Sequence, residues 1–105
     1  MPYEIRITPR AARDIEKLPR PVQDSVLDKL EELGIDPRPP GCQKVKGLEQ
    51  YDVFRLRVAG SYRIVYQVRD EAAWVLALKV ADRKEIYRRL DDLRRLLEPP
   101  LPRNH

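Results

Sequence analysis

The feature that most limits the possible folds of this chain is a change, near residue 50, in the spacing of its apolar residues. From there to residue 81, apolar side chains recur at every second position, which is the period of a β-strand with one buried face. Turn-forming residues interrupt the pattern at Gly60-Ser61 and at Asp70-Glu71-Ala72. We therefore predict strands over residues 50–59, 62–69 and 73–81, joined as an antiparallel meander.

The two faces of this meander differ in chemistry. The apolar face, which is predicted to meet the helices, consists of Phe54, Leu56, Val58, Tyr62, Ile64, Tyr66, Val68, Trp74, Leu76, Leu78 and Val80. The opposite face carries Arg55, Arg57, Arg63, Gln67 and Lys79.

Cations on the polar face have few acids near them in sequence, since Glu49 and Asp52 are the acids between residues 43 and 69. If the turn at Gly60 closes a tight hairpin, Arg57 and Arg63 lie opposite each other, which is unfavourable on a sheet. Because arginine can grip two phosphate oxygens at once, we interpret this face as a site for an anion. A solvated cluster of arginines without a ligand is the alternative.

The flanking segments have the period of helices. Residues 3–8 alternate as a strand, and Thr8-Pro9 predicts the start of a helix that runs to about Leu18. A second helix from about Pro21 is expected to end at Gly34, and residues 35–43 read as a loop. A terminal helix over residues 83–98 has an apolar stripe of Ile86, Leu90, Leu93 and Leu97. The order β-α-α-β-β-β-α predicts an α+β fold with a helical hairpin on one face of an antiparallel sheet.

Composition narrows the possible functions. A chain of 105 residues is expected to form a single domain over residues 1–98 with one modest core, a second core being unexpected, and residues 99–105 are expected to be a flexible tail. His105 and Cys42 are the sole histidine and cysteine, so we expect no disulfide, metal or cofactor and no histidine-based catalysis. We expect no signal peptide or membrane span, and a cytoplasmic location.

Two further candidates follow the last predicted strand. Arg83 begins the terminal helix and Tyr87 lies one helical turn later, so both side chains can point the same way. An arginine can stabilise a phosphate in a transition state, and a tyrosine can stack on a base or carry a proton. Packing between helix and sheet is the alternative for Tyr87.

Several blocks, in this order and spacing, resemble the RelE/ParE toxin superfamily and in particular RelE-like mRNA interferases. They are Tyr3 to Leu18, Lys44-Val45-Lys46-Gly47-Leu48, Tyr51 to Val58, Gly60 to Val68 with its Tyr-Arg-Ile-Val-Tyr core, and Val80-Ala81-Asp82-Arg83-Lys84-Glu85-Ile86-Tyr87. The resemblance covers about residues 3–90. It implies a microbial-RNase-like fold and the toxin of a type II toxin–antitoxin system. Such a toxin is a ribosome-dependent endoribonuclease, in which the 2′-hydroxyl of the mRNA attacks the adjacent phosphate.

The resemblance also implies roles for individual residues. Arg63 would contact the scissile phosphate, and Arg83 would stabilise the transition state or protonate the leaving 5′-oxygen. Tyr87 would stack on or orient the attacked nucleotide, and Arg55 would stabilise charge. RNA binding is expected from Arg57, Lys44, Lys46 and Lys79.

The general base is where the chain departs from the family pattern. Val53 stands where the best-studied type has a lysine in this role, and Asp82 stands where many relatives have a histidine. Arginine stays protonated in proteins, so Arg55 is a poor base. The candidates that stay open are Asp82, Glu49, Asp52 and a deprotonated Tyr87.

Two other functions stay open. They are a ParE-like inhibitor of DNA gyrase without RNase activity and a decayed toxin that only binds. The partners that the resemblance implies are the ribosome, mRNA and a cognate RelB-like antitoxin in a hetero-oligomeric complex. An acidic antitoxin segment is expected to neutralise the arginines. The resemblance also implies that the antitoxin can displace the terminal helix, which otherwise docks on its own sheet.

Overall fold

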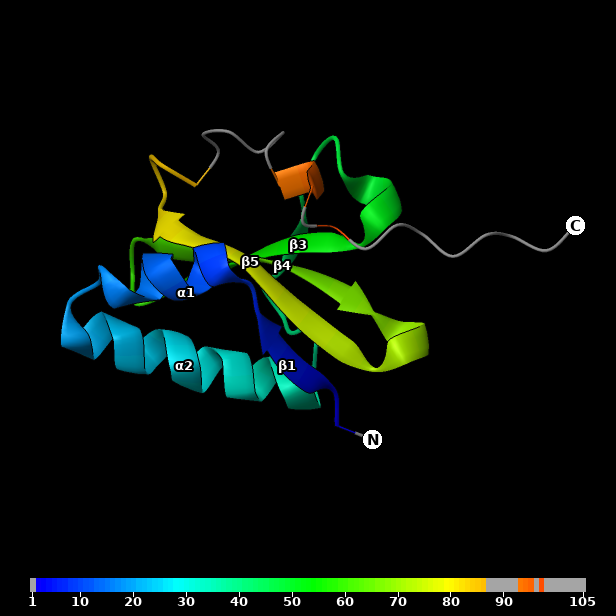
Figure 1. Cartoon of the computed structure of the whole chain (residues 1–105), viewed down its shortest axis with the longest axis horizontal. Coiled ribbons are helices and arrows are strands. Elements are labelled where there is room, and N and C mark those ends of the chain that lie inside the picture. The colour runs from blue at the N-terminus through cyan, green and yellow to red at the C-terminus, as the bar shows by residue number, and fades with distance from the viewer. Residues whose placement is uncertain (1, 87–92, 96, 98–105) are drawn as a thin grey trace, which may run out of the picture.

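The computed structural model describes residues 2–86, 93–95 and 97. Within these residues, two helices pack on one face of a five-stranded mixed sheet of order β1-β5-β4-β3-β2 (Figure 1). The helices are α1 (Pro9–Glu16) and α2 (Arg20–Ile35). The strands are β1 (Glu4–Ile7), β2 (Gln43–Lys44), β3 (Val53–Val58), β4 (Tyr62–Arg69) and β5 (Trp74–Asp82). The predicted α+β fold class, with a helical hairpin on one face of the sheet, is confirmed.

The predicted meander forms the centre of the sheet. β3, β4 and β5 are antiparallel, and β4 has the predicted bounds. β3 is shorter than predicted because Glu49–Tyr51 forms a 3-10 turn, which ends at Asp52 with a left-handed φ of 54°. β1 joins β5 in parallel, so the sheet is mixed and not antiparallel throughout as predicted. The two-residue strand β2, which the sequence did not predict, pairs with β3.

The helical hairpin is fastened to the sheet at both ends. The Thr8 hydroxyl accepts a hydrogen bond from the Ala11 amide (3.1 Å) and donates one to the Ala77 carbonyl (2.9 Å), so the predicted N-cap also ties α1 to β5. The prediction that Gly34 caps α2 is wrong, since the helix continues to Ile35. A Cβ at Gly34 would lie 3.0 Å from the carbonyl oxygen of Tyr3, so glycine permits a close approach of α2 to the start of the chain.

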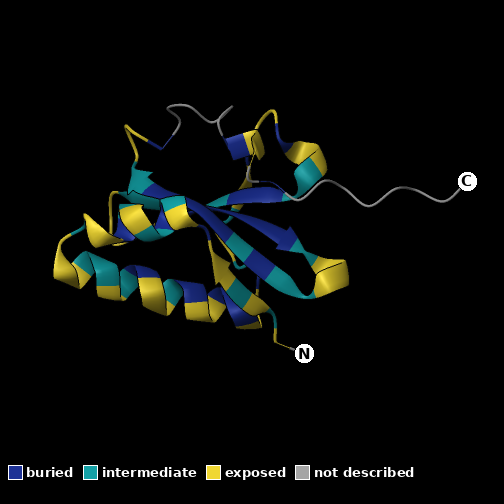
Figure 2. Ribbon diagram, in the orientation of Figure 1, coloured by how far each residue is buried: buried dark blue, intermediate teal, exposed yellow. Residues whose placement is uncertain are grey.

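The face of the sheet that meets the helices is the larger of two apolar regions. Buried residues of α2 and of the central strands are dark blue in Figure 2. We call it the helix-side core, and its buried members are Ala11, Ile15, Val26, Leu30, Leu33, Phe54, Leu56, Val58, Ile64, Tyr66, Val68, Val75, Ala77 and Val80.

A β-bulge in β5 makes one prediction about this core wrong. Val65 pairs with Lys79 and Tyr66 pairs with Ala77, so Leu78 is an extra residue in the ladder. The faces of β5 are therefore exchanged on the N-terminal side of the bulge. Val75 and Ala77 face the helices, whereas Leu76 and Leu78 belong to the other side of the sheet.

The opposite face holds a second apolar cluster, contrary to the expectation of one core. We call it the second cluster, and it comprises Val45, Leu48, Val53, Val65, Leu78, Ile86, Leu93 and Leu97. Three members of the predicted terminal stripe thus pack on the chain's own sheet. Burial on both faces explains why residues 64–68 of β4 are all buried.

The predicted terminal helix falls largely outside the described residues, as do Leu90 and the expected tail over residues 99–105. Within its range, residues 83–86 form a hydrogen-bonded turn and residues 93–95 a short 3-10 turn. In the described part of the chain, no helix combines the length and apolar character that crossing a membrane requires.

Candidate functional site

Strand register brings the predicted cations onto the face of the sheet opposite the helices, which we call the arginine face. Arg57 pairs directly with Arg63, as the tight hairpin predicted. The next row of the sheet joins Arg55 to Val65 and Val65 to Lys79. The turn between β3 and β4 is tight because Ala59 (φ 49°) and Gly60 (φ 81°) both have left-handed backbones.

An open pocket of about 340 Å³ lies on this face and is lined by Gly41, Gln43, Arg55, Arg57 and Arg63. Gln43 is opposite Arg55 in the sheet, and its Oε1 accepts a hydrogen bond from Arg55 Nη2. Sequence reasoning missed Gln43 because β2 is only two residues long and follows a proline-rich loop, so it has no period to detect.

Two arginines of this pocket, Arg57 and Arg63, are available to a ligand. Arg63 Nη1 donates to the Tyr62 carbonyl at 3.1 Å, and the rest of its guanidinium has no partner among the described residues. Nor does the exposed Arg57 side chain bond to any described residue. None of the described residues that line the pocket is an acid, so Arg57 and Arg63 have no carboxylate beside them in this part of the structure, which suits an anion such as a phosphate.

The turn after β5 carries Arg83 to the same end of the sheet. Asp82 pairs with Tyr62, and the Arg83 amide donates to the Ser61 carbonyl at 2.9 Å. Asp82 Oδ1 accepts hydrogen bonds from the amides of Lys84 (3.0 Å) and Glu85 (2.9 Å) and thereby caps the turn. Ser61, Asp82, Arg83 and Lys84 line a second open pocket of about 350 Å³. Tyr87 lies outside the described residues.

The three lysines that were expected to bind RNA have different surroundings. Lys44 pairs with Phe54, which places it on the helix side of the sheet, and its Nζ lies 3.6 Å from Asp52 Oδ1. Lys46 is exposed in the loop between β2 and β3. Lys79 is only 4% exposed and its Nζ donates to the Glu85 carbonyl at 3.0 Å, so its position differs from that of a surface RNA contact.

The candidates for the general base are also separated by the structure. Val53 is fully buried in the second cluster. Asp52 precedes Arg57 by five residues along β3, or about 16 Å at the usual rise of a strand, and the Glu49 carboxylate bonds to the Gly47 amide at 2.8 Å. Asp82 is the described candidate that adjoins Arg83.

A hydrogen-bonded cluster secures the loop that leads to the pocket. Asp70 accepts hydrogen bonds from the Tyr3 hydroxyl (2.6 Å) and from Arg38 Nη1 and Nη2 (3.1 and 2.8 Å). The bonds from Arg38 and then from Tyr3 lower the pKa of the Asp70 carboxyl. The Tyr66 hydroxyl donates to the Pro37 carbonyl at 2.8 Å, and burial raises the pKa of that hydroxyl. These contacts hold residues 36–42, which deliver Gly41 and Gln43 to the pocket.

Metal binding has no support in the described residues, where no three His, Cys, Asp or Glu side chains form a group able to hold an ion. The described site offers arginines, a neighbouring carboxylate and hydrogen-bonding groups.

Comparison with known proteins shows the family of this chain. Residues 5–87 match the family described as the ParE toxin of the type II toxin-antitoxin system, parDE. The chain is 37% identical over 90 residues to Toxin RelG of Mycobacterium tuberculosis, an alignment that covers 85% of this chain and all of RelG. It is 34% identical over 89 residues to the mRNA interferase toxin RelE of Escherichia coli K12, covering 83% and 92% of the two chains.

A solved structure resembles the fold. It is a chain of the toxin-antitoxin complex RelBE2 from M. tuberculosis, with a TM-score of 0.68 and 31% identity over 79% of this chain and 100% of that one. Sequence family, curated relatives and fold thus agree, and the chain belongs to the RelE/ParE superfamily as a RelE-family toxin of a type II toxin–antitoxin system.

Proposed function

We propose that this chain is a ribosome-dependent endoribonuclease that cleaves mRNA. The observation that supports this most is the position of Arg57, Arg63 and Arg83 at one end of the sheet, where the first two line a pocket that has no acid among its described residues. An arginine cluster of this kind can bind a phosphodiester and stabilise the extra charge of its transition state. Its relative RelE of E. coli is named an mRNA interferase, which agrees with this chemistry.

In the proposed reaction, a base removes the proton of the 2′-hydroxyl and the resulting oxygen attacks the adjacent phosphorus. The new bond joins O2′ to phosphorus and the bond from phosphorus to O5′ breaks, which leaves a 2′,3′-cyclic phosphate and a 5′-hydroxyl. Arg57 and Arg63 hold the non-bridging oxygens, and Arg55 adds charge at the edge of the pocket. Arg83 stabilises the charge on the leaving oxygen, which takes up a proton from water, and Tyr87 stacks on the attacked nucleotide.

Asp82 is the base that we propose for this reaction. One carboxylate oxygen caps the turn, and the other has no partner among the described residues. Asp82→Asn keeps an acceptor for the turn but cannot take a proton. We expect the variant to fold normally, as judged by its Tm, and to lose about 10²- to 10⁴-fold in single-turnover cleavage rate. Full activity would exclude Asp82 as the base.

Induction in growing cells, followed by primer extension on translated mRNA, tests the proposal as a whole. The wild-type chain should produce new 5′ ends within coding regions, and Arg63→Ala and Arg83→Ala should not. Arg20→Ala is the matched control, because it removes an equal charge from a side chain that is 83% exposed at the start of α2. Intact transcripts from a growth-arresting wild-type chain would refute cleavage.

A second candidate is inhibition of DNA gyrase, which is favoured by the description of the matching family as ParE. It would appear as relaxed plasmid DNA together with intact mRNA in the same induction. A chain that affects neither growth, mRNA nor supercoiling would be a toxin that has lost its activity.

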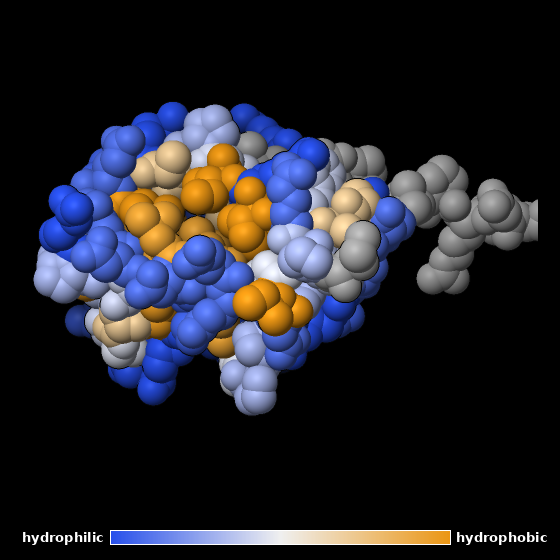
Figure 3. All heavy atoms as spheres, turned by 90° about the horizontal axis from the view of Figure 1, so that it is seen from below, coloured by the Kyte–Doolittle hydropathy of each residue, from blue (hydrophilic) through white to orange (hydrophobic). Residues whose placement is uncertain are grey.

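An antitoxin is the partner that we propose, since the similar RelBE2 structure is a toxin-antitoxin complex. Hydrophobic residues reach the surface in the view from below, ringed by hydrophilic ones (Figure 3), and Leu27 and Ile35 of α2 are 46% and 81% exposed. An acidic antitoxin segment on the arginine face would make the complex dissociate at moderate salt. Survival of the complex at high salt would indicate a mainly apolar interface.

A further inference from the structure

Lys79 is a buried cation for which the proposed mechanism has no role. Its side chain is 4% exposed, and it lies on the arginine face in the row of Arg55 and Val65. The bulge in β5 places it beside Leu78, so that it is flanked by the second cluster. Burial of an ammonium group is unfavourable unless the group bonds to an acceptor, and one acceptor here is the carbonyl of Glu85, 3.0 Å from Nζ.

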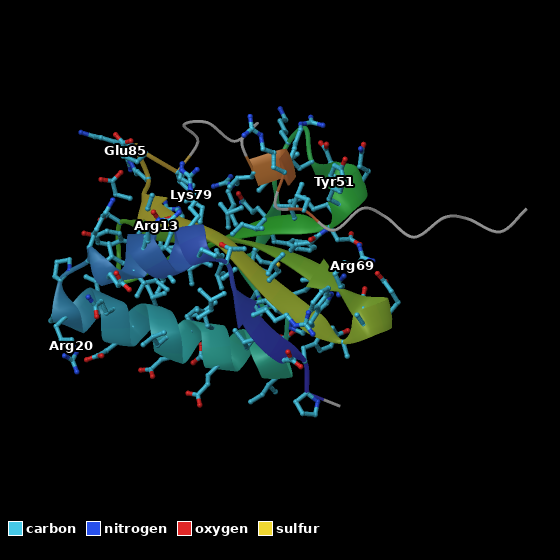
Figure 4. The ribbon with its side chains drawn as sticks, viewed as in Figure 1. Arg13, Arg20, Tyr51, Arg69, Lys79 and Glu85 are labelled. Atoms are coloured by element: carbon cyan, nitrogen blue, oxygen red, sulfur yellow. The ribbon has the colours of Figure 1, made fainter. Side chains whose placement is uncertain are left out.

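The bond from Lys79 completes the support of the turn that carries Arg83. The carboxylate and carbonyl of Asp82 bind the amides at residues 84–86, and the Ser61 carbonyl holds the Arg83 amide. These bonds hold the backbone amides of the turn, and Lys79 adds a side-chain hydrogen bond to the carbonyl of Glu85. Figure 4 shows Lys79 and Glu85 together beside the end of β5.

We propose that Lys79 is a positioning residue for Arg83 and does not contact RNA. Its ammonium group holds the Glu85 carbonyl, and the anchored turn directs the Arg83 guanidinium toward the phosphate. The role of Arg83 rests on the proposed function, whereas the anchoring of the turn does not. Lysine suits this task because its long, flexible chain delivers a compact donor through an apolar layer.

Hydrogen exchange of the backbone amides tests the anchor without reference to catalysis. Lys79→Met removes the donor but leaves an unbranched side chain that can pack against Leu78 and Ile86. Exchange at residues 83–86 should become about tenfold faster, which corresponds to about 1.4 kcal/mol or one lost hydrogen bond. Lys79→Arg should restore slow exchange. Unchanged exchange at these residues in a folded Lys79→Met variant would overturn the proposal.

RNA binding and cleavage then separate positioning from direct contact. For a short single-stranded RNA, Lys79→Met should leave the slope of log Kd against log salt unchanged, whereas loss of a phosphate contact would change it by about 0.7. Lys46→Met, which removes an exposed lysine, is the comparison and should leave exchange at residues 83–86 unchanged. A changed slope for Lys79→Met would identify Lys79 as an RNA contact and overturn the proposal.

Cleavage provides the final measurement. Lys79→Met should lower kcat by about 10- to 100-fold with little change in KM, and Lys79→Arg should recover part of the loss. In an Arg83→Ala background the same change should have little further effect, because the side chain that Lys79 positions is absent. Equal effects in both backgrounds would contradict positioning of Arg83. If the wild-type chain does not cleave RNA, the proposed function fails, and hydrogen exchange still decides whether Lys79 anchors the turn.

Discussion

Replacement of Arg57 by threonine should make the protein more stable while it weakens the site. Arg57 and Arg63 are directly opposite on β3 and β4, where Cβ atoms are about 4.5–5.5 Å apart. Two unit charges about 6 Å apart in water repel by about 0.7 kcal/mol, and cross-strand pairs contribute about 0.2–1 kcal/mol. We therefore expect a gain of about 0.5 kcal/mol, or about 2–4 °C in Tm for a domain of this size.

A double-mutant cycle isolates this repulsion. Arg63→Thr also removes the bond from Nη1 to the Tyr62 carbonyl, so the single variants are not directly comparable. The coupling free energy is obtained from urea unfolding of the wild type, both single variants and the double variant. The loss of that bond cancels in this difference. It should be repulsive at low salt and fall toward zero at about 1 M salt, where the Debye length is about 3 Å.

Lys46→Thr is the control, because it removes the same charge from an exposed loop residue and reports the effect of net charge alone. A coupling that is zero or attractive at low salt would refute the reasoning. An anion bound between the two guanidinium groups should offset their repulsion and make the wild type more stable than Arg57→Thr. Phosphate should therefore raise the Tm of the wild type more than that of Arg57→Thr.

Three further variants test the frame that holds the site. Thr8→Val should lower the free energy of unfolding by about 2 kcal/mol, because a buried helix cap and a hydrogen bond to β5 are both lost. Ser25→Ala, which removes a hydrogen bond within α2, should change the free energy of unfolding far less in the same urea titration. Asp70→Asn should destabilise the protein at neutral pH but much less at about pH 3. The pKa of Asp70 is lowered in the fold, so its contribution to the free energy of unfolding is present above its ordinary pKa and is lost as pH falls through its pKa in the folded protein. Equal destabilisation at both pH values would contradict this. Tyr66→Phe should cost about 1 kcal/mol by leaving the Pro37 carbonyl without its donor. Since the raised pKa of Tyr66 favours its protonated form in the fold, wild-type stability should fall as pH rises above about 10, and urea midpoints should show a smaller fall in Tyr66→Phe.

Local patterns predicted most of the fold. The period of two in β3 and β4 placed Arg57 against Arg63, and Thr8-Pro9 marked the start of α1 because a cap and a proline are both local signals. Gly34 was misread because its role depends on the approach of Tyr3, which is remote in sequence. β2 was missed because two residues cannot show a period.

The candidate site was predicted less completely than the fold. The alternation of residues along the strands predicted that the arginines share one face of the sheet. Gln43 was not predicted because it lines the pocket from β2, and Lys44 lies on the opposite side of the sheet. Tertiary packing, which sequence period does not report, buried Lys79 and formed a second cluster across the sheet. The role of Tyr87 stays a prediction.

The extra residue in β5 has a consequence for how such chains diverge. Because Leu78 stands outside the ladder, a chain that lacked it could keep Val80 opposite Ile64 and Ala77 opposite Tyr66 with every other side chain on its present face. Length variation of one residue is therefore tolerable at this point of the strand, whereas elsewhere in β5 it would invert the faces. Gaps in alignments of related toxins should accordingly collect at residue 78, and comparisons that ignore the offset would match Lys79 to the wrong residue.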